Sequence, residues 1–294
     1  MPLQGKLSES DLTADEIRAI ESHFEKAIDA SSVEPWQPWW LSTEAASLQL
    51  GRSGMSLVQT SDKEDAAEKA PLGGPTINSA DFIPEPPSAP LPSLSSLTSK
   101  KPPPVISLHL LDILFSYCLA LRLFNGQYSS DPVDAMTTVF NASEIICPMD
   151  GGTSWEDMSV NEALMRSISR VTHPSAGRAT VPRGFAIGLV SDVSRMLQLG
   201  RAVVIVALMD MSQLLNAAKQ DVQEYGRAGE RQLQNTLKHA QRKLLFFMSW
   251  ANELNPNIYE ALATQVEIFY AQQKTALETA SNPEIKLSGD VCVD

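Results

Sequence analysis

The feature that most constrains this chain is a long apolar stretch at residues 105–124, which reads VISLHLLDILFSYCLALRLF. A stretch of this length is enough to cross a bilayer as a helix. It contains His109, Asp112 and Arg122, however, and ionisable groups are costly in hydrocarbon. It is apolar on nearly all sides, and Asn125-Gly126 after it is a favourable helix end. We therefore expect a helix at the centre of a protein core rather than a membrane span.

Helical spacing of apolar residues and capping signals predict six more helices after this one. A capping box is expected where Glu162 follows Ser159 by three residues, and a first-turn proline opens two of the helices. No alternating pattern typical of a strand occurs. The predicted fold class is therefore all-α, as an irregular multi-helix bundle or a helical-repeat-like stack. The six helices are expected over residues 132–146, 159–170, 185–197, 202–225, 230–251 and 255–277.

The chain divides by composition into four parts. Residues 1–51 contain a short helix, predicted over residues 15–30 with Asp11 or Thr13 as its cap, and a tryptophan-rich element. Residues 52–104 are rich in Pro and Ser and cannot bury enough apolar area to offset the entropy of ordering. They are predicted to form a disordered linker. The helical domain follows at residues 105–280, and residues 281–294 are expected to be a flexible tail.

Three of the five tryptophans, Trp36, Trp39 and Trp40, lie within five positions of one another. The one amphipathic helix before them supplies too few apolar residues for a core of its own. The cluster therefore either folds back onto the helical domain as an anchor or docks into a partner, where aromatic residues are typical hot spots. The sequence leaves both alternatives open. We take partner binding by these three residues as the hypothesis to test.

Charge and cysteine content argue against several classes of protein. The net charge is −12, and the residues before and after position 104 are both acidic, which argues against direct nucleic-acid binding as the main task. Cys118, Cys147 and Cys292 are too few and too scattered for a disulfide framework or a zinc site. The N-terminus shows no secretory signal. We expect a protein of the cytoplasm, the nucleus or both, without membrane attachment.

No arrangement of side chains in the sequence predicts catalysis, and we expect no catalytic residue, metal ligand or cofactor. His109, Asp112 and Cys118 share one helix, but Cys118 lies more than a turn beyond the other two, which favours packing or capping roles. The loop from His173 to Arg183 carries positive charge that could contact an anionic ligand. A helical ligand-binding protein or enzyme that uses this loop is the alternative hypothesis.

Four basic residues on one predicted helix are the best candidates for nucleic-acid contact: Arg231, Lys238, Arg242 and Lys243. On a helix they cover a broad face rather than a single stripe, and no aromatic ladder for base stacking accompanies them. A solvated helix face is the favoured interpretation, and RNA binding is the lesser one.

In its motifs and their order the chain resembles the zinc finger HIT domain-containing protein 2 family. The resemblance rests on the Pro-Trp-Trp element at residues 38–40, on PPPVISLHLLDILFSYCLALRLFNG, and on HAQRKLLFFMSWAN at residues 239–252. It implies an adaptor or co-chaperone that links RuvB-like AAA+ ATPases to ribonucleoprotein assembly, notably of a spliceosomal particle. The HIT zinc finger of that family, with its closely spaced Cys and His residues, is absent from this chain.

The sequence thus predicts a non-enzymatic adaptor or assembly factor whose activity is protein binding. By resemblance, its partners are RuvB-like AAA+ ATPases and the ribonucleoproteins that they help to assemble. The helical domain is expected to provide a rigid surface, and the tryptophan element beyond the linker a second contact. Two contacts on one chain raise the effective concentration of each for a shared partner.

Overall fold

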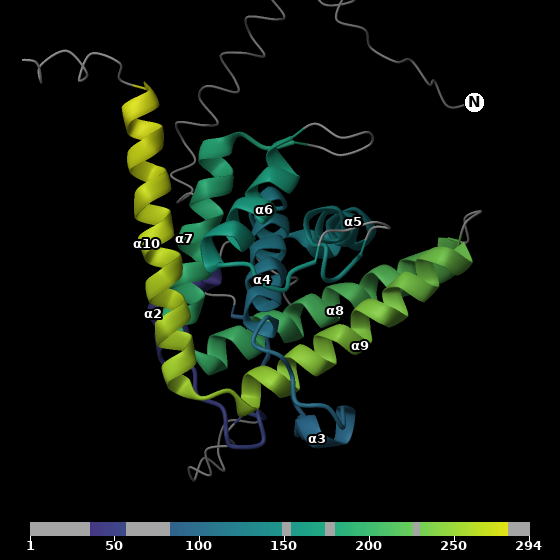
Figure 1. Ribbon diagram of the computed structural model, residues 1–294. Coiled ribbons are helices and arrows are strands. Elements are labelled where there is room, and N and C mark those ends of the chain that lie inside the picture. Colours follow the sequence, from purple (N-terminus) through teal and green to yellow (C-terminus); the bar gives the residue numbers. More distant parts are fainter. Residues whose placement is uncertain (1–35, 57–82, 149–153, 174–179, 226–229, 282–294) are drawn as a thin grey trace, which may run out of the picture. The chain divides into compact units, whose positions relative to one another are not determined.

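The computed structural model describes residues 36–56, 83–148, 154–173, 180–225 and 230–281 (Figure 1). The chain clusters into two units, the first made of residues 1–36 and 74–78 and the second of all the others. Trp36 is the one residue of the first unit that belongs to the described part. The helix predicted over residues 15–30 and the predicted tail after residue 281 lie outside the described residues.

The second unit contains all seven helices predicted after Pro104, with ends that differ by a few residues. They are α4 (Ile106–Leu123), α5 (Pro132–Ala142), α6 (Val160–Thr172), α7 (Arg183–Leu199), α8 (Arg201–Tyr225), α9 (Glu230–Glu253) and α10 (Pro256–Ser281). Shorter elements are η2 (Trp39–Leu41), α2 (Thr43–Ala46), α3 (Leu94–Leu97) and η3 (Tyr128–Ser130). Across the described ranges the only pairing of the β type is an isolated bridge between Leu50 and Ser56. The all-α fold class is confirmed.

Helix α4 lies at the centre of an irregular bundle and contacts α5, α6, α7 and α8 (Figure 1). Helix α10 packs along α7, and α8 and α9 form a long pair that lies side by side. Every residue of α4 from Leu110 to Leu121 is buried, which confirms the predicted central helix. By length and composition alone α4 and α8 would pass as membrane spans, but most of each helix is buried within the fold, as is common for core helices.

Local sequence sets the ends of these helices. The Asp131 carboxylate caps α5 by accepting a hydrogen bond from the Asp134 N–H at 3.1 Å, and Pro132 occupies the first turn. Gly200 alone separates α7 from α8, and its φ of +83° lies in a region that favours glycine. Because the break is one residue long, α8 starts at once at Arg201 and packs against α7.

Residues 83–104 are part of the fold, which corrects the disordered linker predicted for residues 52–104. The segment contains α3, which packs against α9. At the start of α3 the Leu94 N–H donates to Oε1 of Glu253 at 2.7 Å. Each proline has a fixed φ, so ordering this segment costs less entropy than its composition suggests. Residues 57–82 of the predicted linker lie outside the described residues.

A turn at residues 51–54 contacts the segment of residues 83–104 as well. The Leu91 N–H donates to the Ser53 carbonyl at 2.9 Å. Gly54 has a φ of +72°, which other residues rarely adopt, and a Cβ atom there would also displace the end of the Leu91 side chain, since it would lie 2.6 Å from Cδ1. The Asn252 side chain of α9 donates to the Arg52 carbonyl at 3.2 Å. The turn, the proline-rich segment and α9 therefore form one packed corner.

Candidate functional site

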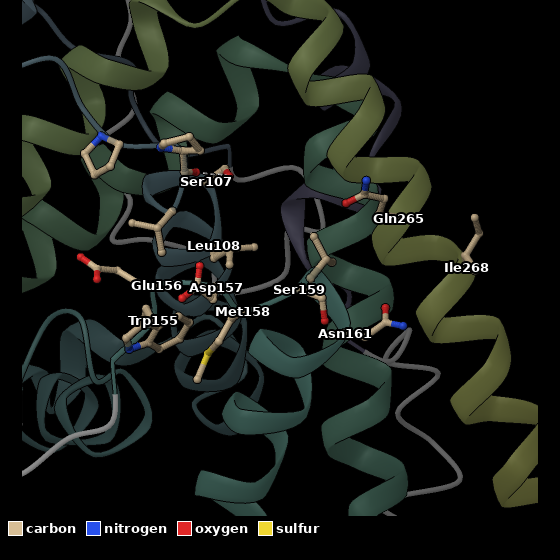
Figure 2. Close-up of a pocket in the computed structure, with 14 residues that line it drawn as sticks. Ser107, Leu108, Trp155, Glu156, Asp157, Met158, Ser159, Asn161, Gln265 and Ile268 are labelled. Carbon is tan, nitrogen blue, oxygen red and sulfur yellow. Dashed lines mark hydrogen bonds between the residues drawn. The ribbon is translucent and has the colours of Figure 1, made fainter.

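A groove of about 850 Å³ lies between the start of α4, the loop before α6 and the outer face of α10 (Figure 2). Helix α10 contributes Gln265 and Ile268, and Ile268 is 52% exposed. The start of α4 contributes Leu108 and residues just before it, and the loop contributes residues 155–161. More than half of the lining residues are apolar. The groove therefore offers an open apolar surface built from three separate parts of the chain.

Trp155 is the largest side chain in the groove, and two neighbours fix its ring. The His109 ring meets it edge-on with 5.4 Å between the centroids, and the Arg166 guanidinium lies 4.9 Å from the Trp155 centroid. Arg166 also pairs with Glu144. Burial lowers the pKa of His109, and the charge of Lys243 lowers it further, so the imidazole packs as a neutral ring. Trp155 is thereby held as a rigid, half-buried aromatic surface.

The loop that carries Trp155 is held by the capping box predicted at the start of α6. Ser159 Oγ accepts from the Glu162 N–H at 3.3 Å, and Glu162 Oε2 accepts from the Ser159 N–H at 2.7 Å. The hydrogen bond from the Ser159 backbone lowers the pKa of Glu162. Just before the cap, Asp157 has a φ of +68°, and the Met158 N–H closes a turn onto the Trp155 carbonyl at 3.4 Å. The capping-box prediction is confirmed, and the cap positions the groove wall.

The charged side chains that line the groove are both acidic. Glu156 and Asp157 are exposed at its edge, and the described lining residues include no Lys, Arg or His. The surface thus combines an apolar floor with a negative rim. Such a surface suits a partner segment that carries apolar side chains and positive charge.

Asp112 is a buried carboxylate on α4 that ties two neighbouring segments to this helix. Ser143 Oγ donates to Asp112 Oδ2 at 2.5 Å, and Ser167 Oγ of α6 donates to Oδ1 at 3.1 Å. The Ile145 N–H also donates to Oδ2, at 3.2 Å. Burial raises the pKa of Asp112 to about 6, although these hydrogen bonds and the charge of Arg170 offset part of the effect. Asp112 therefore has a structural role.

Two residues of the tryptophan element, Trp39 and Trp40, fold back onto the helical domain. Trp40 is fully buried, and Trp39 is 4% exposed. Trp39 Nε1–H donates to the Tyr117 hydroxyl at 2.9 Å, and Trp40 Nε1–H donates to Asp192 Oδ1 at 3.1 Å. Arg122 donates two hydrogen bonds to the same carboxylate, at 2.5 and 2.7 Å. The two indoles therefore attach η2 to both α4 and α7.

A second buried carboxylate, Asp210 on α8, extends this network. The Tyr117 hydroxyl donates to Asp210 Oδ2 at 2.6 Å, and the Tyr128 hydroxyl donates to Oδ1. Burial raises the pKa of Asp210, and the two tyrosine hydrogen bonds offset part of that rise. Burial also raises the pKa of both tyrosine hydroxyls, so they remain donors. The chain of bonds from Trp39 through Tyr117 to Asp210 joins η2, α4 and α8.

The sequence left two alternatives for the tryptophans, an anchor on the helical domain or docking into a partner. In the structure Trp39 and Trp40 act as an anchor. In this arrangement the two indoles offer almost no surface to a partner. Partner binding by them stays a prediction that requires their release from the core. Trp36 is partly exposed, so it could bind a partner without any such release. Partner binding by Trp36 stays a prediction.

The three side chains considered for catalysis on α4 do not meet in one site. Cys118 is fully buried, and its sulfur lies 3.6 Å from that of Met196. Burial raises the pKa of the Cys118 thiol, which disfavours the nucleophilic thiolate. His109 packs on Trp155, and Asp112 binds hydroxyl groups. In the part of the chain that the structure describes, no group of three or more His, Cys, Asp or Glu is placed to hold a metal ion.

The described residues of the loop from His173 to Arg183 do not bring their polar side chains together into one ligand-binding site. His173 is exposed at the end of α6, where its Nδ1 lies 3.0 Å from the Ser169 carbonyl. Arg183 donates to the Gln273 side chain of α10 at 3.0 Å. Residues 174–179 lie outside the described residues.

The basic candidates on α9 do not act as one surface. Lys243 is half-buried, and its Nζ donates to the Ile145 carbonyl at 2.5 Å. Lys238 and Arg242 are exposed. The side chain of Arg231 lies outside the described residues. Nucleic-acid contact by these residues stays a prediction.

Trp155 and the polar partners of Trp39 and Trp40 were not among the residues predicted from the sequence. One signal for Trp155 was available, because a lone large aromatic residue lies four residues before the N-cap Ser159 of a capping box. Asp192 and Asp210 also gave a signal, because a carboxylate inside an apolar helical pattern must find a buried donor. Which donor each one finds depends on how the helices pack.

Comparison with known proteins identifies part of this domain. Residues 89–225 match the family model described as SHQ1 protein, Shq1 domain. The match covers a little less than half of the chain and extends from the proline-rich segment before α3 to the end of α8. No solved structure matches the chain.

This match shows that the resemblance to the zinc finger HIT domain-containing protein 2 family was wrong. The motifs behind that resemblance were mostly apolar helices, which unrelated helical proteins share. The Shq1 domain is that of a non-catalytic assembly factor, so the prediction of a non-enzymatic protein with a role in ribonucleoprotein assembly is confirmed. The chain therefore carries, over residues 89–225, a region that matches the Shq1 domain of a non-catalytic ribonucleoprotein assembly factor.

Proposed function

We propose that this chain is an assembly factor for H/ACA small nucleolar ribonucleoproteins. The observation that carries the proposal is the match of residues 89–225 to the Shq1 domain, whose family assembles these particles. The matched region includes Tyr117 and Asp192, which bind the tryptophan element outside it. Trp39 and Trp40 therefore belong to the same folded unit, and we include them in the proposed binding module.

We assign the groove around Trp155 to a protein component of the particle, of the dyskerin type that the SHQ1 family binds. A held aromatic side chain in an apolar groove has the properties of a binding hot spot. Proteins that bind RNA carry positive surface to neutralise phosphates. The acidic rim formed by Glu156 and Asp157 is complementary to such a surface.

We also propose that the chain works with RuvB-like AAA+ ATPases, in the nucleus, the cytoplasm or both. The SHQ1 family works with these ATPases, which supports the proposal. Trp36 is a partly exposed aromatic residue outside the groove and is the residue we suggest for this second contact. A separate contact lets the chain hold an ATPase and a particle protein at the same time.

The proposal is tested by affinity purification of the full chain from cells, followed by mass spectrometry. We expect enrichment of H/ACA proteins and of RuvB-like ATPases. A binding assay with purified dyskerin-type protein then compares the chain with its Trp155→Ala variant. Removal of a hot-spot tryptophan costs about 2 kcal/mol or more, so we expect affinity to fall about 30-fold.

The matched control is Leu123→Ala, which truncates an apolar side chain that is 46% exposed and lies outside the groove. This variant should bind with unchanged affinity. Thermal unfolding of each variant checks that the fold is retained. Absence of H/ACA proteins from the purified complexes would contradict the proposed particle, and equal binding by the Trp155→Ala variant would contradict the groove.

A further inference from the structure

A second groove, of about 560 Å³, lies on another side of the domain, between the proline-rich segment and the α8–α9 pair. Its floor is apolar and includes Met209 of α8 with Leu245 and Met248 of α9. Leu245 is 36% exposed, so its side chain offers apolar surface to a ligand in the groove. Methionine side chains adapt to differently shaped partners, so this floor suits an inserted apolar side chain.

One wall of this groove is the segment Pro87–Pro92, and the structure holds it firmly. The Ser56 N–H donates to the Pro87 carbonyl at 3.4 Å, and the Leu91 N–H donates to the Ser53 carbonyl at 2.9 Å. The prolines restrict the backbone between these two bonds. A wall that is already ordered adds little entropic cost to binding.

The opposite edge of the groove carries Lys238 and Arg242, which are four residues apart on α9 and therefore share one face. Both side chains are exposed, and no carboxylate in the described ranges pairs with either of them. No acidic residue is among the described residues that line this groove. In a chain with 35 acidic and 23 basic residues, this is a local positive site on an acidic protein.

We propose that this groove binds a short acidic segment of a partner protein, with one apolar side chain seated on the methionine floor. Lys238 and Arg242 would pair with two carboxylates of that segment. The apolar floor and the absence of aromatic side chains from the described lining favour a peptide over RNA, which needs more cations and stacking surfaces. This site is separate from the groove around Trp155 and does not depend on the function proposed for it.

The test uses the full chain and fluorescein-labelled 12-residue peptides in which Asp or Glu alternates with Leu, Met or Phe. Fluorescence anisotropy measures their affinity, and hydrogen exchange locates the bound peptide. We expect acidic peptides to protect the backbone amides of Ser88, Ala89 and Leu91 and those of α9. The double variant Lys238→Glu with Arg242→Glu should weaken binding about tenfold or more, and added salt should weaken binding to the unmodified chain.

The matched control is Lys100→Glu with Lys101→Glu, which makes the same change in net charge at two exposed residues outside the groove. This control should bind within about twofold of the unmodified chain. Equal weakening by both double variants, or equal binding of peptides with Asn and Gln in place of the acids, would overturn the proposal. The proposal would also be overturned if a uridine 12-mer bound more tightly than every acidic library peptide. The same holds for a peptide of residues 282–294 from the chain itself.

Discussion

Replacement of Trp40 by alanine tests whether the tryptophan element is part of the core or a detachable contact. Trp40 is fully buried, and its indole N–H is bonded to Asp192. If the element is a core component, the substitution must destabilise the whole domain. If the element spends its time away from the domain, the free energy of unfolding will not change.

The structure sets the size of the expected effect. Truncation of a buried aromatic side chain to alanine costs about 3–5 kcal/mol through lost burial and the cavity left behind. The lost hydrogen bond adds about 1 kcal/mol, less than is usual for a bond to a charged group, because Asp192 keeps two donors from Arg122. The sum of about 4–6 kcal/mol is a large fraction of the stability of a typical domain. Trp40→Phe keeps most of the burial and should cost about 1–2 kcal/mol, through the lost hydrogen bond and the smaller ring.

Urea unfolding followed by circular dichroism measures both variants against the unmodified chain. The control is Leu41→Ala, because Leu41 is the next residue and is 44% exposed. It should cost less than about 1 kcal/mol. An unfolding midpoint for Trp40→Ala that matches the unmodified chain would refute the anchor and restore partner docking as the role of this residue.

Two further predictions concern the network around α4 and α6. Because burial raises the pKa of Asp112 from 3.8 to about 6, its ionisation opposes folding, and stability should fall by about 3 kcal/mol as pH rises from about 4 to 6. Asp112→Asn should remove this pH dependence. If the urea midpoint changed with pH from 4 to 7 by the same amount in the variant and in the unmodified chain, the prediction would be contradicted. Ser159→Ala removes the N-cap of α6 and should lower the free energy of unfolding by about 1 kcal/mol in the same assay. A Ser99→Ala control, on an exposed residue, should leave it unchanged.

The helices were predictable because their signals are local. The Ser159–Glu162 capping box and Pro132 after Asp131 each fix a helix start from a few neighbouring residues. The apolar stretch before Asn125 was sufficient to place α4 at the centre, since a helix that is apolar all round must be covered on every side. Such signals do not depend on the rest of the fold.

The parts that sequence analysis missed depend on contacts between distant residues. Residues 83–104 have no helical period, and their order comes from bonds to residues near Ser53 and to Glu253. The acceptor of Trp40 is 152 residues further along the chain, and no spacing rule connects the two. The prediction of disorder from composition was also misleading. It treats prolines as evidence for disorder, although they reduce the conformational entropy of the unfolded chain and so lower the cost of ordering it. The same dependence on packing explains why the candidate grooves could not be foreseen.

The distance in sequence between Trp40 and Asp192 also affects how this domain is made. A ribosome adds about 5–20 residues per second, so Asp192, which is 152 positions after Trp40, is added roughly 8–30 s after it. During that time the Pro-Trp-Trp element has emerged without the helix that buries it. It is then an apolar segment available to chaperones and to other unfinished chains, and the domain closes only after α7 has been synthesised. Nascent chains arrested before residue 192 should therefore be the form of this protein most dependent on chaperones.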